Sequence, residues 1–229
     1  MDAAVRKTEC FDEHPLLAGL SADAVARLTT TATTLNVPRG EIVFREGERS
    51  PGVYLVMQGL IKLSLQTDHG RTRVIDLIGV GGSFGEPALF LGQRQLATAE
   101  AAMNAGLMCL GKAAILGEIR NNGQFAERVI CALAGRIYSC KESMRAHMLL
   151  SGTQRVIHYL LNLLPDDRTC SAVAVTFPAR KGVIASRLNL TQEHFSRILR
   201  DLAAAALIEV DGAQVHIRDI ERLRIYEPA

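Results

Sequence analysis

Apolar and polar positions follow three different patterns along this chain, and each pattern predicts a different kind of structure. Between residues 34 and 118, short apolar segments such as 53–59, 60–66 and 71–79 alternate with polar turns. Glycines mark the corners between these segments, at Gly40, Gly47, Gly59, Gly70 and Gly82. Short strands with regular glycine turns are typical of a sandwich or barrel. We therefore expect an all-β region over most of the first half of the chain.

The second pattern lies in residues 125–150 and predicts one long helix with a narrow apolar seam. Its apolar positions are three and four residues apart, which is the spacing of a coiled-coil interface. The seam consists of Ile130, Leu133, Ile137, Cys140 and Met144, and His147 continues the spacing. Arg128, Arg136 and Lys141 fall outside it. We interpret this segment as a parallel dimerisation helix; an ordinary amphipathic core helix is the alternative.

The third pattern covers residues 151–229 and predicts a winged helix-turn-helix. A first helix begins after a cap at Ser151 or Thr153, and a short strand follows at 172–178. Two helical segments, 181–188 and 191–206, are separated by only two residues. An Asp211-Gly212 turn then joins two short strands in a hairpin. The whole chain is thus expected to be α+β, with units at 1–124, 125–150 and 151–229.

The second helix of this pair has the residue types of a DNA-reading surface. Phe195, Ile198, Leu199 and Leu202 share one face and can seal a core. The opposite face carries the side chains that we expect to read base edges, namely Glu193, Ser196 and Arg197. Arginine matches guanine bidentately and glutamate accepts from a base amino group. The short preceding helix and the following hairpin favour this interpretation over a merely solvated charged face.

Other polar residues around this face are candidates for positioning contacts with the phosphates of double-stranded DNA. They are Thr191, which is also a good helix cap, and Gln192, Arg180, Lys181, Arg187 and Arg200. The chain has 229 residues, is 48% hydrophobic and has a formal net charge of only +2. A basic surface must therefore be local.

The termini and the cysteines fit a cytoplasmic protein without a membrane segment. The first ten residues are polar and contain no apolar core of a secretory signal. No apolar run approaches the 18 residues that a membrane span needs. The five cysteines are scattered and contain no CxxC spacing, which fits a reducing compartment and gives no zinc or iron–sulfur motif.

Four segments resemble the family of catabolite activator and fumarate–nitrate reduction regulators (Crp/Fnr). They are residues 15–21, 40–48, the Phe84-Gly85-Glu86 motif and 190–199, which contains Glu-x-x-Ser-Arg. The resemblance implies a cyclic-nucleotide-binding-type β-roll (a jelly roll), a dimerisation helix and a winged helix-turn-helix. It further implies a non-enzymatic homodimer on a TTGAT-type inverted repeat, with RNA polymerase as a partner if the protein is an activator.

Within the family, residues 97–101 and 193–198 are most similar to the dissimilatory nitrate respiration regulators. Those members respond to nitric oxide, with haem as the proposed sensor. Oxygen-sensing members carry an N-terminal cysteine cluster, whereas this chain has only Cys10 there. The resemblance therefore speaks against an iron–sulfur cluster and for a haem response.

The stretch 82–98 keeps only part of a cyclic-nucleotide cradle. Gly85 and Glu86 fit the backbone turn and the ribose-binding carboxylate. Aligned with the family, Gln95 and Leu96 occupy the positions of the arginine and serine that hold the cyclic phosphate. Arg94 is one residue away, and on a strand that offset points it to the other face. We therefore expect Leu96 to place an apolar group in the cradle, and cyclic AMP not to be the ligand.

Haem needs an axial His, Cys or Met ligand in an apolar pocket. His14, before Pro15, is the first candidate, although an exposed N-terminal histidine is the plainer interpretation; the others are His69, Cys109, Cys131, Met103 and Met144. Three alternatives remain: a regulator without a ligand, a cyclic-nucleotide-responsive regulator of the same fold, and a regulatory subunit that binds protein rather than DNA. A cupin-type enzyme would need several metal ligands on its strands, and the β region has only His69.

Overall fold

The computed structural model describes residues 14–67, 70–164 and 173–227. The chain divides into two compact units, residues 1–138 and 139–229, each of which is described by itself below. The expected α+β class is confirmed, with a β-roll first, a long helix next and a winged helix-turn-helix last. No helix in these described ranges is long and apolar enough to cross a membrane.

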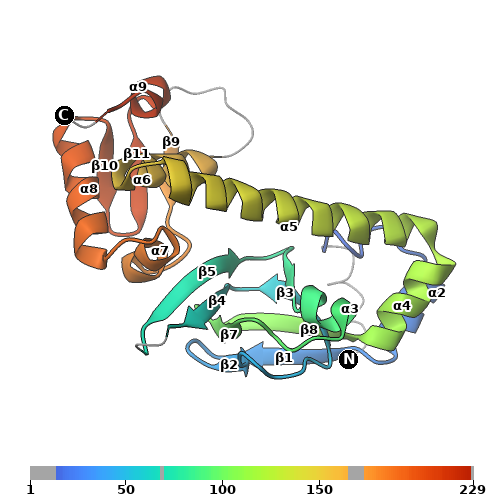
Figure 1. The fold of residues 1–229 in the computed structure, drawn as a ribbon. Helices are drawn as coiled ribbons and strands as arrows, with labels where there is room; N and C mark the ends of the chain where they lie inside the picture. Colours follow the sequence, from blue (N-terminus) through green and yellow to red (C-terminus); the bar gives the residue numbers. More distant parts are fainter. Residues whose placement is uncertain (1–13, 68–69, 165–172, 228–229) are drawn as a thin grey trace. The chain divides into compact units, whose positions relative to one another are not determined.

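Two four-stranded antiparallel sheets form the β-roll (Figure 1). The first has the order β1 (Thr33–Val37), β8 (Ala105–Gly111), β3 (Gly52–Gln58), β6 (Ser83–Phe84). The second has the order β2 (Ile42–Phe44), β7 (Thr98–Ala101), β4 (Ile61–Gln66), β5 (Thr72–Ile78). Both sheets contribute to one core, where Tyr54 stacks on Phe84 with ring centroids 5.0 Å apart and Phe44 packs against both rings. Burial of these three aromatic side chains between the two sheets helps to hold the sheets face to face.

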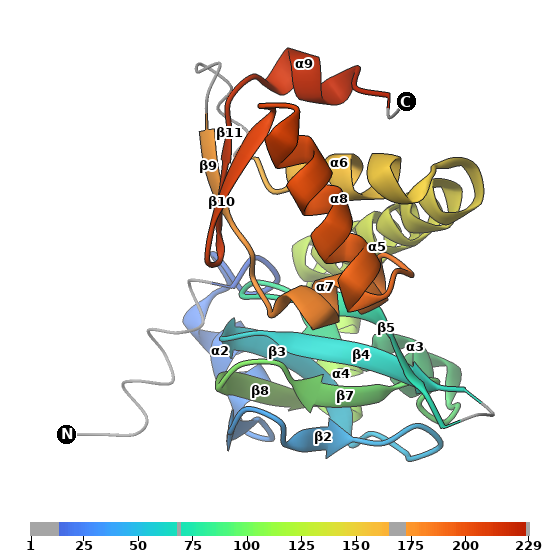
Figure 2. The same cartoon turned by 90° about the vertical axis from the view of Figure 1, so that its left-hand side faces the viewer.

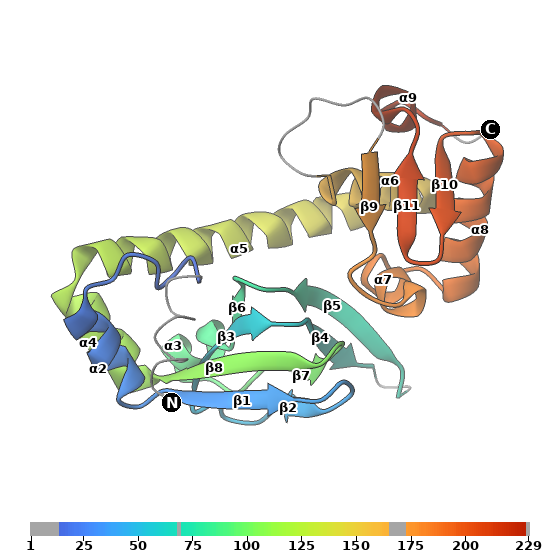
Figure 3. The same ribbon diagram turned by 180° about the vertical axis from the view of Figure 1, so that it is seen from behind.

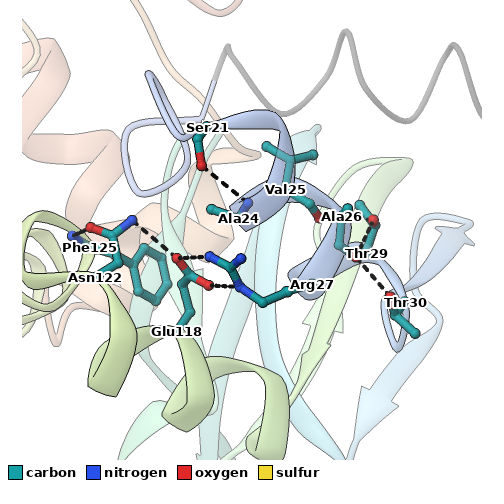
Figure 4. Close-up of polar contacts among 10 residues, drawn as sticks. All are labelled: Ser21, Ala24, Val25, Ala26, Arg27, Thr29, Thr30, Glu118, Asn122 and Phe125. Carbon is teal, nitrogen blue, oxygen red and sulfur yellow. Dashed lines mark hydrogen bonds and ion pairs between the residues drawn. The ribbon is translucent and has the colours of Figure 1, made fainter.

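Three helices and the first turns of a fourth complete the N-terminal unit. They are α2 (Ala22–Thr29), α3 (Glu86–Leu91), α4 (Lys112–Asn121) and α5 (Gly123–Leu149). A second core lies among them, where Leu17 and Leu28 pack with Phe125 and Val129 of α5. Close to it, Arg27 of α2 donates to the carboxylate of Glu118 of α4 (Figure 4).

Helix α5 is one continuous helix of 27 residues. Two arginines attach its first half to the β-roll: Arg128 donates to the carbonyl of Ala18, and Arg136 donates to the carbonyl of Ser83. Arg136 also lies 3.3 Å from the carboxylate of Asp76. The sequence placed both arginines only outside the apolar seam; the structure shows that they fix which side of α5 faces the β-roll.

The C-terminal unit is a winged helix-turn-helix. Its helices are α6 (Gly152–Asn162), α7 (Lys181–Arg187), α8 (Gln192–Ala204) and α9 (Ile220–Arg224). Its sheet has the order β10 (Ile208–Asp211), β11 (Gln214–Ile217), β9 (Val173–Thr176) (Figure 3). Ser151, not Thr153, caps α6, and it forms a capping box with Gln154. The apolar faces of α6, α7 and α8 close one core against this sheet (Figure 2).

Candidate nucleic-acid interface and sensor cradle

Helix α8 separates an apolar face from a polar one, as its sequence predicts. Phe195, Ile198 and Leu202 are at most 3% exposed and anchor the helix in the core. On the other side, Glu193, Arg197 and Arg200 are exposed and Ser196 is half-buried. The three candidate base-reading side chains thus lie on one accessible face within the first two turns. This is the part of a recognition helix that enters the major groove.

The turn before α8 uses two of the predicted positioning residues to build the helix itself. The hydroxyl of Thr191 accepts the backbone N–H of His194 at 3.2 Å, as an N-cap does. The side chain of Gln192 reaches back to Gly182 of α7. Its Oε1 atom is so close that a Cβ added at Gly182 would lie 2.7 Å from it. Asn189 takes up the left-handed backbone of the turn with φ 54°. Local geometry therefore explains why these residue types occur here.

The predicted basic set divides into two groups. Arg180 and Arg200 are exposed, and Lys181 is half-buried at the start of α7. Arg187, also expected among the phosphate contacts, is half-buried and lines a crevice beside Tyr159 of α6, where its charge acts on the tyrosine hydroxyl. The sequence alone could not distinguish Arg187 from the exposed arginines, because a side chain at the end of α7 can point either to solvent or toward α6.

The cradle of the β-roll is formed by Gly85, Glu86 and Gln95. Gly85 has φ 93°, a conformation that favours glycine, and it precedes α3 as the N-cap. Glu86 and Gln95 are only 5% and 7% exposed. The Oε2 atom of Glu86 and the Nε2 atom of Gln95 are buried without a hydrogen-bond partner among the described residues. The cradle thus offers an acceptor and a neutral donor.

Arg94 and Leu96 lie outside the cradle. The guanidinium of Arg94 is exposed and donates to the carbonyl of Gly47 at 2.8 Å. Leu96 is 78% exposed, so the expectation that it places an apolar group in the cradle was wrong. Gln95 lies in the segment before β7, where its backbone exchanges hydrogen bonds with Gly47 and Glu48; its side chain is buried, whereas those of Arg94 and Leu96 are exposed.

His14 is buried, at 2% exposure, rather than being an exposed terminal histidine. Its Nδ1 atom accepts the backbone N–H of Leu16 at 3.2 Å, and its Nε2 atom lies 3.2 Å from the carbonyl of Gly82. This arrangement requires the neutral Nε2–H tautomer, and burial lowers the pKa of the ring in agreement with it. Neither nitrogen has a lone pair left for iron, so His14 does not fit an axial haem ligand here.

The other haem candidates are scattered. Cys109 is buried on β8, and burial raises the pKa of its thiol. A hydrogen bond with Tyr54 has the smaller, opposite effect and lowers that pKa. Cys131, Met103 and Met144 are exposed. His69 and the N-terminal Cys10 lie outside the described residues. Within the described residues, no group of three His, Cys, Asp or Glu side chains is placed to hold a metal ion.

Four exposed apolar residues of α5, namely Ile130, Ile137, Met144 and Met148, lie along one line of the helix and form a stripe, whereas the exposed Tyr138 and Leu149 lie beside that line. Cys140, at the edge of the expected seam, is also exposed. Leu133, which the sequence placed in the seam, is half-buried and packs against the chain's own core beside Phe125. His147 lies in the same crevice as Arg187. The apolar face that α5 leaves uncovered is thus turned slightly from the one that spacing alone predicts.

Two protein-family descriptions match this chain. The cyclic nucleotide-binding domain matches residues 34–122, which is the β-roll. The Crp-like helix-turn-helix domain matches residues 154–226, which contain α6 to α9. Each match falls on one of the structural units that the fold shows.

Curated relatives and solved structures resemble nearly the whole chain. A CRP-like cAMP-activated global transcriptional regulator of Mycobacterium tuberculosis is 26% identical over 90% of this chain and 92% of its own. The nitrogen fixation regulation protein FixK of Azorhizobium caulinodans is also 26% identical, over 90% of this chain and 85% of its own. The structure of FixK2 from Bradyrhizobium japonicum has a TM-score of 0.75 at 24% identity, covering 87% and 98% of the chains, and supports the fold.

Proposed function

The chain belongs to the Crp/Fnr family of DNA-binding transcription regulators, and from that premise we propose that it acts as a homodimer that reads a TTGAT-type inverted repeat. The observation that carries this proposal is the accessible face of α8. Glu193, Ser196 and Arg197 stand on it in the Glu-x-x-Ser-Arg order, with Phe195 and Ile198 buried behind them. Their accessibility leaves them able to contact base edges.

The apolar stripe of α5 supports the proposed dimerisation. Ile130, Ile137 and Met144 are each more than half exposed and are separated by seven residues, so they lie along one line of the helix. A single chain gains nothing from such a line in water, whereas a second copy can bury it. Two recognition helices placed about one turn of DNA apart would then match an inverted repeat.

The cradle supports a signal other than a cyclic nucleotide. A cyclic phosphate needs a charged partner, and arginine is the usual one. Gln95 is neutral and buried at that place, while Arg94 is exposed and bonded to Gly47. We propose that the β-roll keeps the frame of the cradle but responds to a different effector, or to none.

A nitric oxide response through haem remains a separate hypothesis, and His14 does not support it. To bind iron, the ring would have to give up its contact with Leu16 or with Gly82. We expect His14→Gln to leave the Soret band of haem-reconstituted protein unchanged. A shifted band that follows this substitution, with saturable stoichiometry, would show that His14 rearranges to become a ligand.

The test of the proposed function is a binding titration on three labelled duplexes of equal length. One carries two TTGAT half-sites as an inverted repeat, one has a single half-site scrambled, and one is random. We expect tight binding to the first and at least tenfold weaker binding to the second, because one recognition helix loses its bases. Equal affinity for all three duplexes would reject the TTGAT assignment.

A further inference from the structure

A crevice with both polar and apolar lining lies within the C-terminal unit, between the last turns of α5, helix α6 and the end of α7. Its volume is about 110 Å³. Residues 139, 142, 143, 146 and 147 of α5 and residues 155, 158, 159 and 162 of α6 line it, at the spacing of one helical face each. Arg187 and Leu188 of α7 complete the lining. Several polar side chains of α5 and α6 therefore face each other across an open crevice.

Two hydrogen-bond donors of this crevice have no partner among the described residues. They are the hydroxyl of Tyr159 and the Nε atom of Arg155, and both atoms are buried. Tyr159 is only 8% exposed as a residue. Burial raises its pKa to about 12, with the charge of Arg187 acting in the opposite direction, so the hydroxyl keeps its proton and donates. A buried donor without an acceptor is unfavourable, and such a pair points to an acceptor that is not among the described residues.

The charge of the described lining is positive. Arg155 and Arg187 line the crevice together, which brings two guanidinium groups to one void. The Nδ1 atom of His158 lies 3.3 Å from the amide nitrogen of Asn162, which leaves its Nε2–H as a further donor. Glu142 is the carboxylate among these lining residues, and it lies 3.5 Å from Arg145 outside the crevice. Donors and positive charge together select an anion with several acceptor oxygens.

We propose that this crevice is a binding site for a small phosphate-type oxyanion, held by Arg155, Tyr159 and Arg187. The guanidinium groups match a tetrahedral oxyanion in charge and in hydrogen-bond geometry. A crevice of about 110 Å³ has room for a single phosphate group. Because the donors are buried, a small ion fits better than the backbone of a DNA duplex.

An ion in this crevice would bridge the last turns of α5, helix α6 and the end of α7, beside the apolar core that α6 and α7 already share. The ion would neutralise positive charge between α6 and α7, and it would face the last turns of α5. Helix α7 leads into the turn that positions α8. The site is distinct from the cradle of the β-roll and from the exposed face of α8. It therefore goes beyond the proposed reading of a TTGAT repeat and does not depend on it.

Isothermal titration of inorganic phosphate into the full-length protein tests the proposal, at constant ionic strength with chloride as the exchanged anion. We expect saturable binding that weakens at least tenfold in both Arg155→Gln and Tyr159→Phe. Tyr159→Phe removes one hydroxyl and keeps the ring, so the fold is retained. Arg224→Gln, on the exposed part of α9, is the matched control and should bind phosphate as the unmodified protein does. A parallel titration with glycerol 3-phosphate distinguishes the free ion from a phosphorylated metabolite, and saturable binding of either supports the site.

Three results would overturn the proposal. Without saturable heat from either ligand, the crevice holds water alone. Saturable binding that both variants retain would place the anion elsewhere, for example on the exposed arginines near α8. If free phosphate fails to bind while Arg155→Gln weakens the affinity for random DNA, the crevice instead contacts the DNA backbone.

Discussion

The carboxylate of Glu118 on α4 accepts two hydrogen bonds from the guanidinium of Arg27 on α2, at 2.8 and 3.1 Å (Figure 4). The Glu118 side chain is completely buried, whereas that of Arg27 is half exposed. Asn122 donates to the same carboxylate at 3.1 Å, and its own amide oxygen accepts the N–H of Phe125 at the start of α5. One carboxylate thus joins α2, α4 and the beginning of α5.

Replacing Glu118 with Gln should destabilise the protein at neutral pH by about 1–3 kcal/mol, because charged hydrogen bonds are weakened at a buried position. The hydrogen bonds and charge of Arg27 hold the pKa of Glu118 below its usual value of 4.5. The stabilisation is therefore present above pH 4.5 and is lost as the pH falls through the folded-state pKa. Urea unfolding followed by circular dichroism at pH 7 and pH 3.5 measures this difference.

Glu127→Gln, on the exposed side of α5, is the control for the loss of one carboxylate. We expect it to change stability by less than about 0.5 kcal/mol at either pH. A Glu118→Gln variant that is as stable as the Glu127 variant at pH 7 would contradict the role of the Arg27 pair.

His14 also makes the protein less stable as the pH falls, but over a higher pH range than Glu118 does. Its buried, neutral ring has a pKa below the usual 6.5, so the unfolded chain takes up the proton before the folded one does. The stability that His14 contributes is complete above pH 6.5 and is lost as the pH falls through its folded-state pKa. His14→Gln cannot titrate, and we expect its stability deficit at pH 8 to shrink steadily at pH 5.5. A deficit that stays constant over this range would mean that His14 is not buried in its neutral form.

The stripe of α5 predicts a charge-sensitive dimer. Ile137 is 58% exposed in the single chain and lies in the middle of the stripe, so Ile137→Asp would bury a carboxylate in the dimer interface. We expect loss of dimer in analytical ultracentrifugation, together with loss of binding to the inverted-repeat duplex. Cys131→Asp introduces the same charge on an exposed position of α5 away from the stripe and should keep both. Dimeric Ile137→Asp protein would reject the stripe as the interface.

The sequence predicted the order of the units, because each unit has its own pattern of apolar positions. Short apolar segments between glycine turns, the spacing of α5 and the apolar face of α8 are local signals, and Phe195, Ile198, Leu199 and Leu202 are buried as expected. The helix-turn-helix was readable for the same reason: its two helices and their turn lie within 24 contiguous residues, 181–204. The exposed face of Glu193 and Arg197 then follows from helical geometry alone.

The parts that could not be predicted depend on contacts between distant segments. The burial of His14 needs the carbonyl of Gly82, which is 68 residues away, and the side of α5 that faces the β-roll is set by Arg136 and Ser83. Leu96 was misplaced because an alignment counts residues, whereas it is Gln95 whose side chain is buried where its backbone bonds to Gly47 and Glu48. The crevice of Arg155, Tyr159 and Arg187 draws on three helices, and no spacing within one helix reveals it.

The recognition helix allows base contacts to be separated from phosphate contacts with two arginines of the same helix. Arg197 and Arg200 are both exposed on α8, and Arg197 lies one turn closer to its start. We expect Arg197→Ala to lose about 1–3 kcal/mol of discrimination between the inverted repeat and a duplex with the guanine of each half-site replaced. Arg200→Ala should instead weaken binding to both duplexes alike and lower the slope of log affinity against log salt by about 0.9. Anisotropy titrations at several salt concentrations measure both quantities, and equal losses on both duplexes for Arg197→Ala would make that residue a phosphate contact.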